Sequence, residues 1–294
     1  MKRIKLFVMS MVAVLLVSCG TSNTVPITGR KQNLMVSDGE ILTLSTQQYQ
    51  EFMKTAKLST NATNTAMVKR VGQNLANAVV SYLNANGLQN DVQNYQWTFN
   101  LVADNQANAW CMPGGLIVVY EGILPITQDE ASLAIVLGHE IAHAVARHSA
   151  EQMSTKIKQQ YGVQGLGALA SVLGVGSNTV AIGQAVAAQG LNFANLKYSR
   201  DHENEADHMG LIFAAMAGYD PSVAVTFWQR MSAASGNKST SEFLSDHPSD
   251  ATRIKNIQGW LPEAKQYYKP KTTTTTKKTT TKKTTTKKTT TKKK

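Results

Sequence analysis

Cysteine is scarce in this chain, with two copies, Cys19 and Cys111, among 294 residues. At most one intrachain disulfide can form, and none remains if Cys19 is modified, so the fold depends on its hydrophobic core rather than on cross-links. A reactive thiol needs an activating charged neighbourhood, and the sequence around Cys111 offers none. We therefore expect Cys111 to be a small buried residue and not a nucleophile.

Acidic residues are missing from the C-terminal stretch. Eleven lysines lie from Lys269 onward, with no aspartate or glutamate and, apart from Pro270, no aliphatic or aromatic side chain among them. Without these lysines and the three cations at the N-terminus, the formal charge of +11 becomes −3, so the composition does not indicate a nucleic-acid partner. We expect residues 269–294 to be a disordered tail, which either contacts anionic lipid or cell-wall polymer or is simply solvated or glycosylated.

The N-terminus has no hydrophobic run long enough to cross a membrane comfortably. Residues 1–18 instead combine a basic start, an apolar stretch and small residues, which is typical of a secretory signal peptide. The junction resembles a bacterial lipobox, Leu16-Val17-Ser18-Cys19, and predicts cleavage before Cys19 and lipidation of that cysteine. Residues 19–36 are then expected to be a polar tether. In a two-membrane host, Gly20 favours the periplasmic face of the outer membrane; the alternative is an uncleaved N-terminal anchor.

The strongest chemical signal is the H-E-x-x-H pattern at 139–143, inside the apolar stretch 131–146. This stretch is too long for a strand and predicts a buried helix. At about 100° per residue, His139, Glu140 and His143 then share one sector of the helix. Two imidazoles one turn apart can hold a single Zn²⁺ while the glutamate reaches the water beside it. His148 falls on the opposite side and is not expected to be a ligand.

The competing interpretation is that these histidines are ordinary core residues. It would leave a carboxylate buried without a partner, which costs several kcal/mol. A catalytic zinc site needs a third protein ligand and an open position. The stretch 199–207 offers Glu203, with Asp207 one turn later on the same face, while Glu205 points elsewhere. We predict Glu203 as the third ligand and Asp207 as the residue that holds the outer nitrogen of a ligating histidine; otherwise the stretch is only a solvated helix start.

Four separated segments together resemble metallopeptidase family forty-eight, which holds HtpX and CAAX prenyl protease relatives and soluble periplasmic lipoproteins of the BepA and LoiP type. The segments are H-E-x-x-H at 139–143, S-R-x-x-E-x-E-A-D at 199–207, N-A-[aromatic]-x-x-P-G-G at 108–115, and H-P-S followed by R-I at 247–254. The resemblance covers roughly residues 33–261. It implies an α+β fold, mainly helical and zincin-type, with a small antiparallel or mixed β-sheet.

The resemblance also implies an activity, that of an endopeptidase with one Zn²⁺ per chain, acting on polypeptides of the cell envelope. Glu140 would take a proton from the attacking water and pass it to the leaving amine. His247 is implied to lie near the metal, as a partner of the oxyanion or as a resting-state ligand. Asn108, Ala109 and Trp110 are implied to form an edge strand that binds substrate; the residues alone leave a simple hairpin rim equally open. The alternative function is a weakly catalytic or non-catalytic binding factor in outer-membrane protein assembly.

The rest of the domain, expected over 37–268, is predicted to pack around this site. Apolar spacing predicts helices over 37–57 and 65–83 and strands over 95–102 and 116–120, with later helices reaching 217, 231 and 257. Residues 162–191 are rich in glycine and alanine. A dinucleotide-binding fold is excluded there because no strand precedes the G-x-G-x-x-A pattern and no acid lies about 20 residues after it. We expect a helical hairpin beside the active site that touches lipid or gates the cleft, rather than a membrane span.

Overall fold

The computed structural model describes residues 21–159, 192–234, 243, 247 and 251–270. The predicted signal peptide, Cys19, the segment 162–191 and the tail beyond residue 270 lie outside the described residues, so those predictions remain predictions. Among the helices that are described, none combines the length and the apolar character that a membrane crossing requires.

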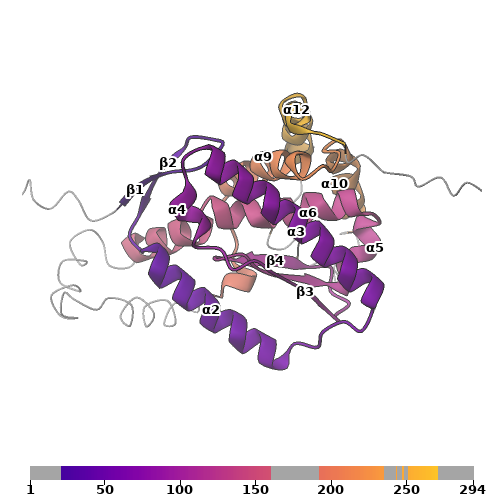
Figure 1. The fold of residues 1–294 in the computed structure, drawn as a ribbon, viewed down its shortest axis with the longest axis horizontal. Coiled ribbons are helices and arrows are strands. Elements are labelled where there is room, and N and C mark those ends of the chain that lie inside the picture. Colours follow the sequence, from indigo (N-terminus) through magenta and orange to yellow (C-terminus); the bar gives the residue numbers. More distant parts are fainter. Residues whose placement is uncertain (1–20, 160–191, 235–242, 244–246, 248–250, 271–294) are drawn as a thin grey trace, which may run out of the picture.

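A three-stranded mixed sheet lies at the centre of the molecule (Figure 1). Its strands are β3 (Thr98–Val102), β4 (Ala109–Met112) and β5 (Leu116–Tyr120), in the order β3-β5-β4. β3 runs parallel to β5, and β4 runs antiparallel to it. Because β5 is buried on both faces, its sequence is a continuous apolar run rather than an alternating one. The predicted strand over 116–120 is confirmed, and the one predicted over 95–102 begins only at Thr98.

Helices cover both faces of this sheet (Figure 1). α2 (Asp38–Thr55) packs on one face, and α3 (Ala62–Ala85) with α6 (Glu130–Val145) on the other. Side chains on β5 alternate between the two faces, so Ile117 joins the core under α3 and α6 while Val118 joins the core under α2. The mainly helical α+β architecture with a small mixed sheet is therefore confirmed.

α9 (Arg200–Met216) crosses α6 with the two backbones in close approach. A Cβ on Gly210 would lie 2.8 Å from the backbone nitrogen of His139, and a Cβ on Gly138 would lie 2.8 Å from the carbonyl oxygen of Gly210. Both distances are shorter than a real Cβ contact tolerates. Glycine at these two positions therefore allows the helix that carries Glu203 to reach the helix that carries the H-E-x-x-H pattern.

The remaining helices pack around the place where α9 crosses α6. α10 (Val223–Ala234) and α12 (Ala251–Tyr267) pack against α6 and α9. α12 runs well beyond the predicted end at residue 257, because Ala264 is buried and continues its apolar side. The shorter elements are α4 (Gln89–Val92), η1 (Glu121–Ile123), α5 (Leu124–Thr127) and η2 (Phe193–Asn195).

The N-terminal residues differ from the predicted tether. Strands β1 (Thr21–Thr24) and β2 (Lys31–Leu34) pair antiparallel as a hairpin. The hairpin packs on the domain through the buried Leu34 and through Gln32, whose Nε2 donates to the carbonyl oxygen of Ala146 at 2.6 Å. Polar composition concealed this strand, because one of its two inward-facing residues is a glutamine rather than an apolar side chain.

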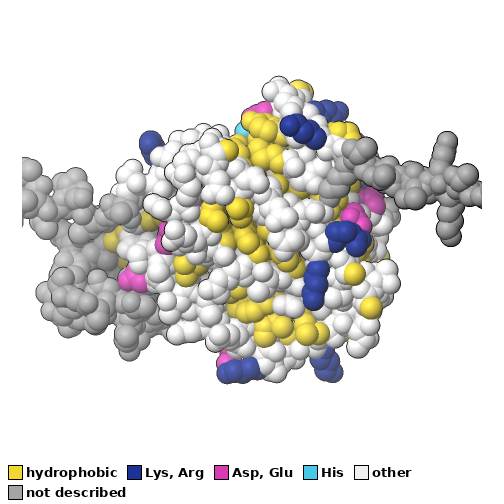
Figure 2. Space-filling view, in the orientation of Figure 1, with side chains coloured by type: hydrophobic (Ala, Val, Ile, Leu, Met, Phe, Trp, Pro, Cys, Tyr) yellow, Lys and Arg dark blue, Asp and Glu magenta, His cyan; other side chains and the backbone are white. Residues whose placement is uncertain are grey.

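Basic side chains do not gather on the visible face of the folded part. Figure 2 shows the lysines and arginines standing apart from one another around the periphery, with apolar side chains between them. A nucleic-acid groove would need a continuous basic stripe, so this face agrees with the charge of −3 for residues 19–268.

Candidate metal centre

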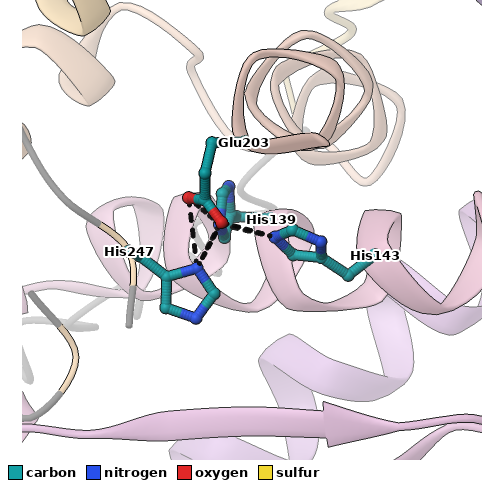
Figure 3. Close-up of side chains that lie close together, drawn as sticks. All are labelled: His139, His143, Glu203 and His247. Carbon is teal, nitrogen blue, oxygen red and sulfur yellow. Dashed lines mark hydrogen bonds and ion pairs between the residues drawn. The ribbon is translucent and has the colours of Figure 1, made fainter. Parts of the chain in front are cut away.

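His139 and His143 lie one turn apart on α6, in a stretch where every residue from Ser132 to Val145 is buried. The helix begins at the N-cap Asp129, whose side chain accepts a hydrogen bond from the backbone of Ser132. The two Nε2 atoms face each other at 3.1 Å (Figure 3). Local helix geometry therefore creates the first half of the site.

Glu203 comes from the first turn of α9 and points down onto this pair (Figure 3). Its Oε2 lies 3.4 Å from Nε2 of His139, and its Oε1 lies 3.4 Å from Nε2 of His143. Ser199 caps the helix by accepting a hydrogen bond from the backbone of His202, which fixes where the first turn begins. The structure thus brings together the three side chains that the sequence predicted as ligands.

His247 completes a group of four. Its Nδ1 lies 3.1 Å from Nε2 of His139 and 3.0 Å from Oε1 of Glu203. Each of the four residues offers one donor atom, and these atoms all lie within 4.8 Å of one another. The predicted proximity of His247 to the other donors is therefore what the structure shows.

The donor set fits a divalent cation. Ligands about 2.0–2.1 Å from a tetrahedral zinc ion lie roughly 3.3 Å from each other, and the contacts among the imidazoles and Glu203 span 3.0 to 3.4 Å. The two imidazoles of the pair differ in how readily they take up a proton, and burial lowers the pKa of His143 well below its usual value. Burial and Arg253 oppose protonation of His139, yet Asp207 and Glu203 raise the pKa of His139 to about 9. A metal ion would take the place of that proton.

Asp207 supports His139 from behind. Its Oδ1 lies 3.0 Å from Nδ1 of His139, on the side of the ring away from Glu203. Arg253 of α12 holds the same carboxylate, donating from Nε at 2.6 Å and from Nη2 at 2.9 Å. The guanidinium in turn lies 3.7 Å over the ring of Trp228. Asp207 is therefore placed as predicted, and Arg253 is an additional buried partner.

Two carboxylates of the site have opposite environments. Burial raises the pKa of Glu140, and no hydrogen-bond partner of its Oε1 is present among the described residues; Nε2 of His247 is 3.6 Å away. Burial also acts on Glu203, but His247, His139 and His143 outweigh it and hold the pKa of Glu203 well below its usual value. Glu203 is therefore held in its ionised form among the donors, whereas Oε1 of Glu140 has no hydrogen bond within the described part of the chain and can accept a proton.

The segment predicted to form an edge strand, residues 108–110, lies at the edge of the sheet, but not all of its side chains face the candidate metal ligands. β4, which contains Ala109 and Trp110, is the edge strand next to β5. The ring of Trp110 packs on the α2 side, 5.0 Å from Phe52 and away from α6. The backbone of the segment is partly paired, since the carbonyl oxygen of Asn108 accepts a hydrogen bond from Tyr120 and that of Ala107 accepts one from Phe243.

Three side chains near the donors escaped the sequence prediction. Tyr198 stacks on His143 with ring centroids 4.0 Å apart, and Phe243 stacks on His247 at 4.7 Å. Nδ1 of His148 lies 2.8 Å from Nδ1 of His143. No motif marks the two aromatic residues. His148 was judged from ideal helix geometry, which does not apply because the helix ends at Val145.

A buried H-E-x-x-H helix that meets a glutamate from a second helix defines a metallopeptidase-type centre. Residues 62–261, more than half of the chain, match the family described as Peptidase family M48, and the chain belongs to this family. The resemblance drawn from the four sequence segments is thereby confirmed.

Several curated relatives are similar to this chain. A mitochondrial metalloendopeptidase OMA1 of Schizosaccharomyces pombe is 39% identical over 171 residues, which is 58% of this chain and 48% of the relative. A mitochondrial metalloendopeptidase OMA1 of Bos taurus is 30% identical over 247 residues, covering 81% of this chain and 46% of the relative. A putative beta-barrel assembly-enhancing protease of Vibrio cholerae is 30% identical over 143 residues, covering 48% and 29%. The chain thus spans half or less of the length of these relatives.

Proposed function

We propose that this protein is a zinc-dependent endopeptidase that hydrolyses peptide bonds of cell-envelope proteins, in quality control or maturation. The observation that carries the proposal is the convergence of His139, His143 and Glu203 from two helices, with the unpaired Oε1 of Glu140 beside them. Membership of Peptidase family M48 supports the reaction class. Zinc is the proposed ion because it favours imidazole and carboxylate donors at tetrahedral separations.

The chemistry assigned to the chain centres on Glu140. When bound, a zinc ion held by three such donors lowers the pKa of a coordinated water towards about 7 and polarises a carbonyl oxygen. Oε1 of Glu140 is buried and available to accept a proton, and its raised pKa makes it a better base than a solvated carboxylate. It then holds this proton until it passes it to the leaving amine. Glu140 is thus first the base and then the acid.

His247 has one of two proposed roles. It either serves as a fourth donor in the resting site or donates a hydrogen bond to the oxyanion that forms on the substrate. The 3.1 Å separation between its Nδ1 and Nε2 of His139 favours the fourth-donor role in this conformation. The imidazole would then have to leave to make room for the attacking water before reaction, because a catalytic site needs one open position.

Extended polypeptide is the proposed substrate class. β4 is an edge strand that contains Ala109 and Trp110, and Asn108 directly precedes it. A substrate that adds to such an edge gains main-chain hydrogen bonds without side-chain specificity. The bond from Phe243 to the carbonyl oxygen of Ala107 already uses one acceptor next to this edge. Substrate binding is therefore proposed to exchange that contact for its own.

The proposed location is the periplasmic face of the outer membrane. The supporting observation is the signal-like leader followed by the lipobox-like cysteine at position 19. The relative named as a beta-barrel assembly-enhancing protease agrees with an envelope role, whereas other relatives are named as mitochondrial. The lipid anchor is proposed as the membrane contact, with the lysine-rich tail as an additional contact to anionic surfaces.

A second candidate function is a binding or assembly factor for outer-membrane proteins with little proteolysis. It is favoured by the burial of all four donor residues and by the placement of His247 among them, which together restrict access. The two functions differ in their need for Glu140. Complementation of a deletion strain by Glu140→Gln would support the binding factor, and failure to complement would support the peptidase.

The direct test is metal analysis of the purified mature protein together with a casein digestion. We expect about one zinc per chain and cleavage that is abolished by a chelator and restored by added zinc. Glu140→Gln is the matched control, expected to keep the metal and to lose cleavage. Absence of bound metal after loading, or cleavage that survives chelation, would contradict the proposal.

A further inference from the structure

The second histidine of the pair, His143, is supported differently from the first. α6 ends at Val145, and Arg147 adopts a left-handed backbone conformation with φ of 53°. The chain therefore turns sharply, and the buried His148 comes back towards the helix that it has just left. Its Nδ1 lies 2.8 Å from Nδ1 of His143, the ring nitrogen away from Glu203.

His148 leads to a carboxylate. Its Nε2 lies 2.9 Å from Oε2 of Glu205, which belongs to α9 and is buried. Glu205 is held in turn by the N-terminal hairpin, since its Oε1 accepts a hydrogen bond from Oγ1 of Thr28 and its Oε2 accepts one from Nε of Arg30 at 2.8 Å. Arg30 is itself clamped by both oxygens of Glu151, each at 2.8 Å. An unbroken polar chain therefore links His143 to the hairpin.

The direction of these hydrogen bonds follows from metal binding. A neutral histidine that ligates through Nε2 carries its one proton on Nδ1. Nδ1 of His143 must then donate, and Nδ1 of His148 must accept. His148 consequently keeps its proton on Nε2 and donates it to Glu205. The bound state of His143 thus requires a hydrogen-bond acceptor at the position of His148 and a second acceptor at the position of Glu205.

We propose that Thr28 and Arg30 of the hairpin, acting through Glu205 and His148, are positioning residues for the metal ligand His143 and tighten metal binding. The proposal rests on the metal site of the proposed function. The hairpin lies before residue 62, where the match to Peptidase family M48 begins. The N-terminal hairpin, which lies outside the matched range, therefore helps to position His143, which lies inside it. The hairpin is thus part of the metal site rather than a spacer.

The alternative is that the chain of contacts only stabilises the fold. A purely structural role would lower the unfolding temperature of the metal-free and the metal-loaded protein by the same amount and would leave the zinc dissociation constant unchanged. A positioning role instead weakens zinc binding and reduces the increase in unfolding temperature that zinc produces. These two readouts separate the alternatives without any measurement of proteolysis.

The experiment measures zinc affinity by competition with a chromophoric chelator, on the mature protein. His148→Phe removes the acceptor while filling the space, and we expect a 10- to 100-fold rise in the zinc dissociation constant, about the effect of losing an outer partner of a ligand. The double variant Thr28→Val with Arg30→Gln removes the hairpin contacts and touches no ligand. For it we expect a smaller rise of about three- to tenfold, because Glu205 and His148 remain.

Two controls make the result decisive. Arg70→Gln breaks the exposed pair with Glu130, far from the chain of contacts, and should leave zinc affinity unchanged. If His148→Phe does not fold, the hairpin double variant decides the question alone. A zinc affinity of the hairpin variant within twofold of the parent would overturn the proposal, and so would an unchanged affinity of a folded His148→Phe. If the parent protein itself binds no zinc, the proposed metal site and the proposed function are both refuted, and this result is distinct from a negative result for the hairpin alone.

Discussion

The two histidines of the metal centre perform the same task with unequal support. Behind His139 stands one carboxylate, Asp207, which contacts the ring directly and is held by Arg253. Behind His143 stand a second imidazole, His148, and only then a carboxylate, Glu205. The first support is complete within α9 and α12. The second support also includes Thr28 and Arg30 of the N-terminal hairpin, which contact Glu205.

This difference follows from the geometry of one helix. α9 supplies both Asp207 and Glu205, but they are two residues apart and therefore face about 160° away from each other. Asp207 shares its face with Glu203 and reaches His139 at once. Glu205 points to the other side, where the turn after α6 delivers His148 to meet it. A single acidic helix can thus serve two ligands, provided that a second histidine bridges the longer path.

Glu140→Gln is the reference variant, because it changes neither the contacts behind His139 nor those behind His143. We expect proteolysis to fall by a factor on the order of 10² to 10⁴, the usual contribution of a positioned acid–base group. Zinc content should be unchanged, because Glu140 is not among the donor residues. Casein cleavage and metal analysis of the same preparation check both parts. A variant that cleaves at the parental rate would remove Glu140 from the mechanism.

Asp207→Leu should damage the direct support most severely. It removes the hydrogen bonds that the buried Arg253 makes to Asp207 and leaves the guanidinium to Glu203 and the carbonyl oxygen of His247, which costs about 1.5–3 kcal/mol of stability. It also removes the partner of His139, which weakens metal binding about 10- to 100-fold. Asp207→Asn retains an acceptor and should lose less of both. Urea unfolding and zinc competition measure the two effects. Equal stability losses for Asp207→Leu and His148→Phe would contradict the difference drawn between a charged and a neutral partner.

Gly210→Ala tests the close approach of α6 and α9, on which the contacts behind both histidines depend. The added Cβ would lie 2.8 Å from the backbone nitrogen of His139, so the two helices must separate. We expect a loss of about 1–3 kcal/mol in stability and weaker zinc binding, because Glu203 moves with α9. Gly259→Ala is a matched control, since nothing lies within 4 Å of the new atom. An undisturbed zinc affinity in Gly210→Ala would show that the crossing is not what sets the donor geometry.

Removal of zinc by a chelator should lower the unfolding temperature, because an ion that binds only the folded chain stabilises it. At a free zinc concentration about 100 times the dissociation constant, the stabilisation is about 2.7 kcal/mol. Differential scanning calorimetry with and without chelator measures the shift. The shift should be preserved in Glu140→Gln and reduced in variants of either support.

The smallest expected effect concerns acid. Burial opposes ionisation of Glu205, but His148, Arg30 and Thr28 outweigh it and lower its pKa to about 2. Because the folded pKa lies below the unfolded value near 4.3, the stabilising contribution is fully present above that value and is lost as the pH falls towards 2. The stability gap between the parent and Glu205→Gln should therefore be largest above about pH 5 and should shrink on acidification, as measured by urea unfolding at several pH values. A gap that does not change with pH would contradict the assignment.

The spacing of residues along each helix predicted the contact of Asp207 with His139, but it did not predict the contacts of His148 and Glu205 behind His143. His139, His143, Glu203 and Asp207 each recur at a spacing of one helical turn within their helix, and this spacing is enough to place them on a common face. His148 and Glu205 follow no such rule, because their meeting depends on a positive φ at Arg147 and on the crossing of two helices. The hairpin was predicted as a tether for a related reason, since its inward-facing Gln32 gives no hydrophobic alternation.

The sequence by itself determined the donor types, their spacing along each helix and the central apolar strand, because these depend on neighbours within one or two turns of the chain. It also showed the membership of a peptidase family, because four short motifs recur in order along the chain. The family resemblance implied that His247 lies near the metal, but only the tertiary structure set its contacts with His139 and Glu203. Only the tertiary structure likewise decided that Trp110 turns away from the donors and that Thr28 and Arg30 lie on the far side of Glu205 and His148 from His143. The contacts of His247 with His139 and of Thr28 and Arg30 with Glu205 join residues more than a hundred positions apart, and the contact of Trp110 with Phe52 also joins separate elements. Their formation depends on how helices cross and strands dock rather than on any local periodicity.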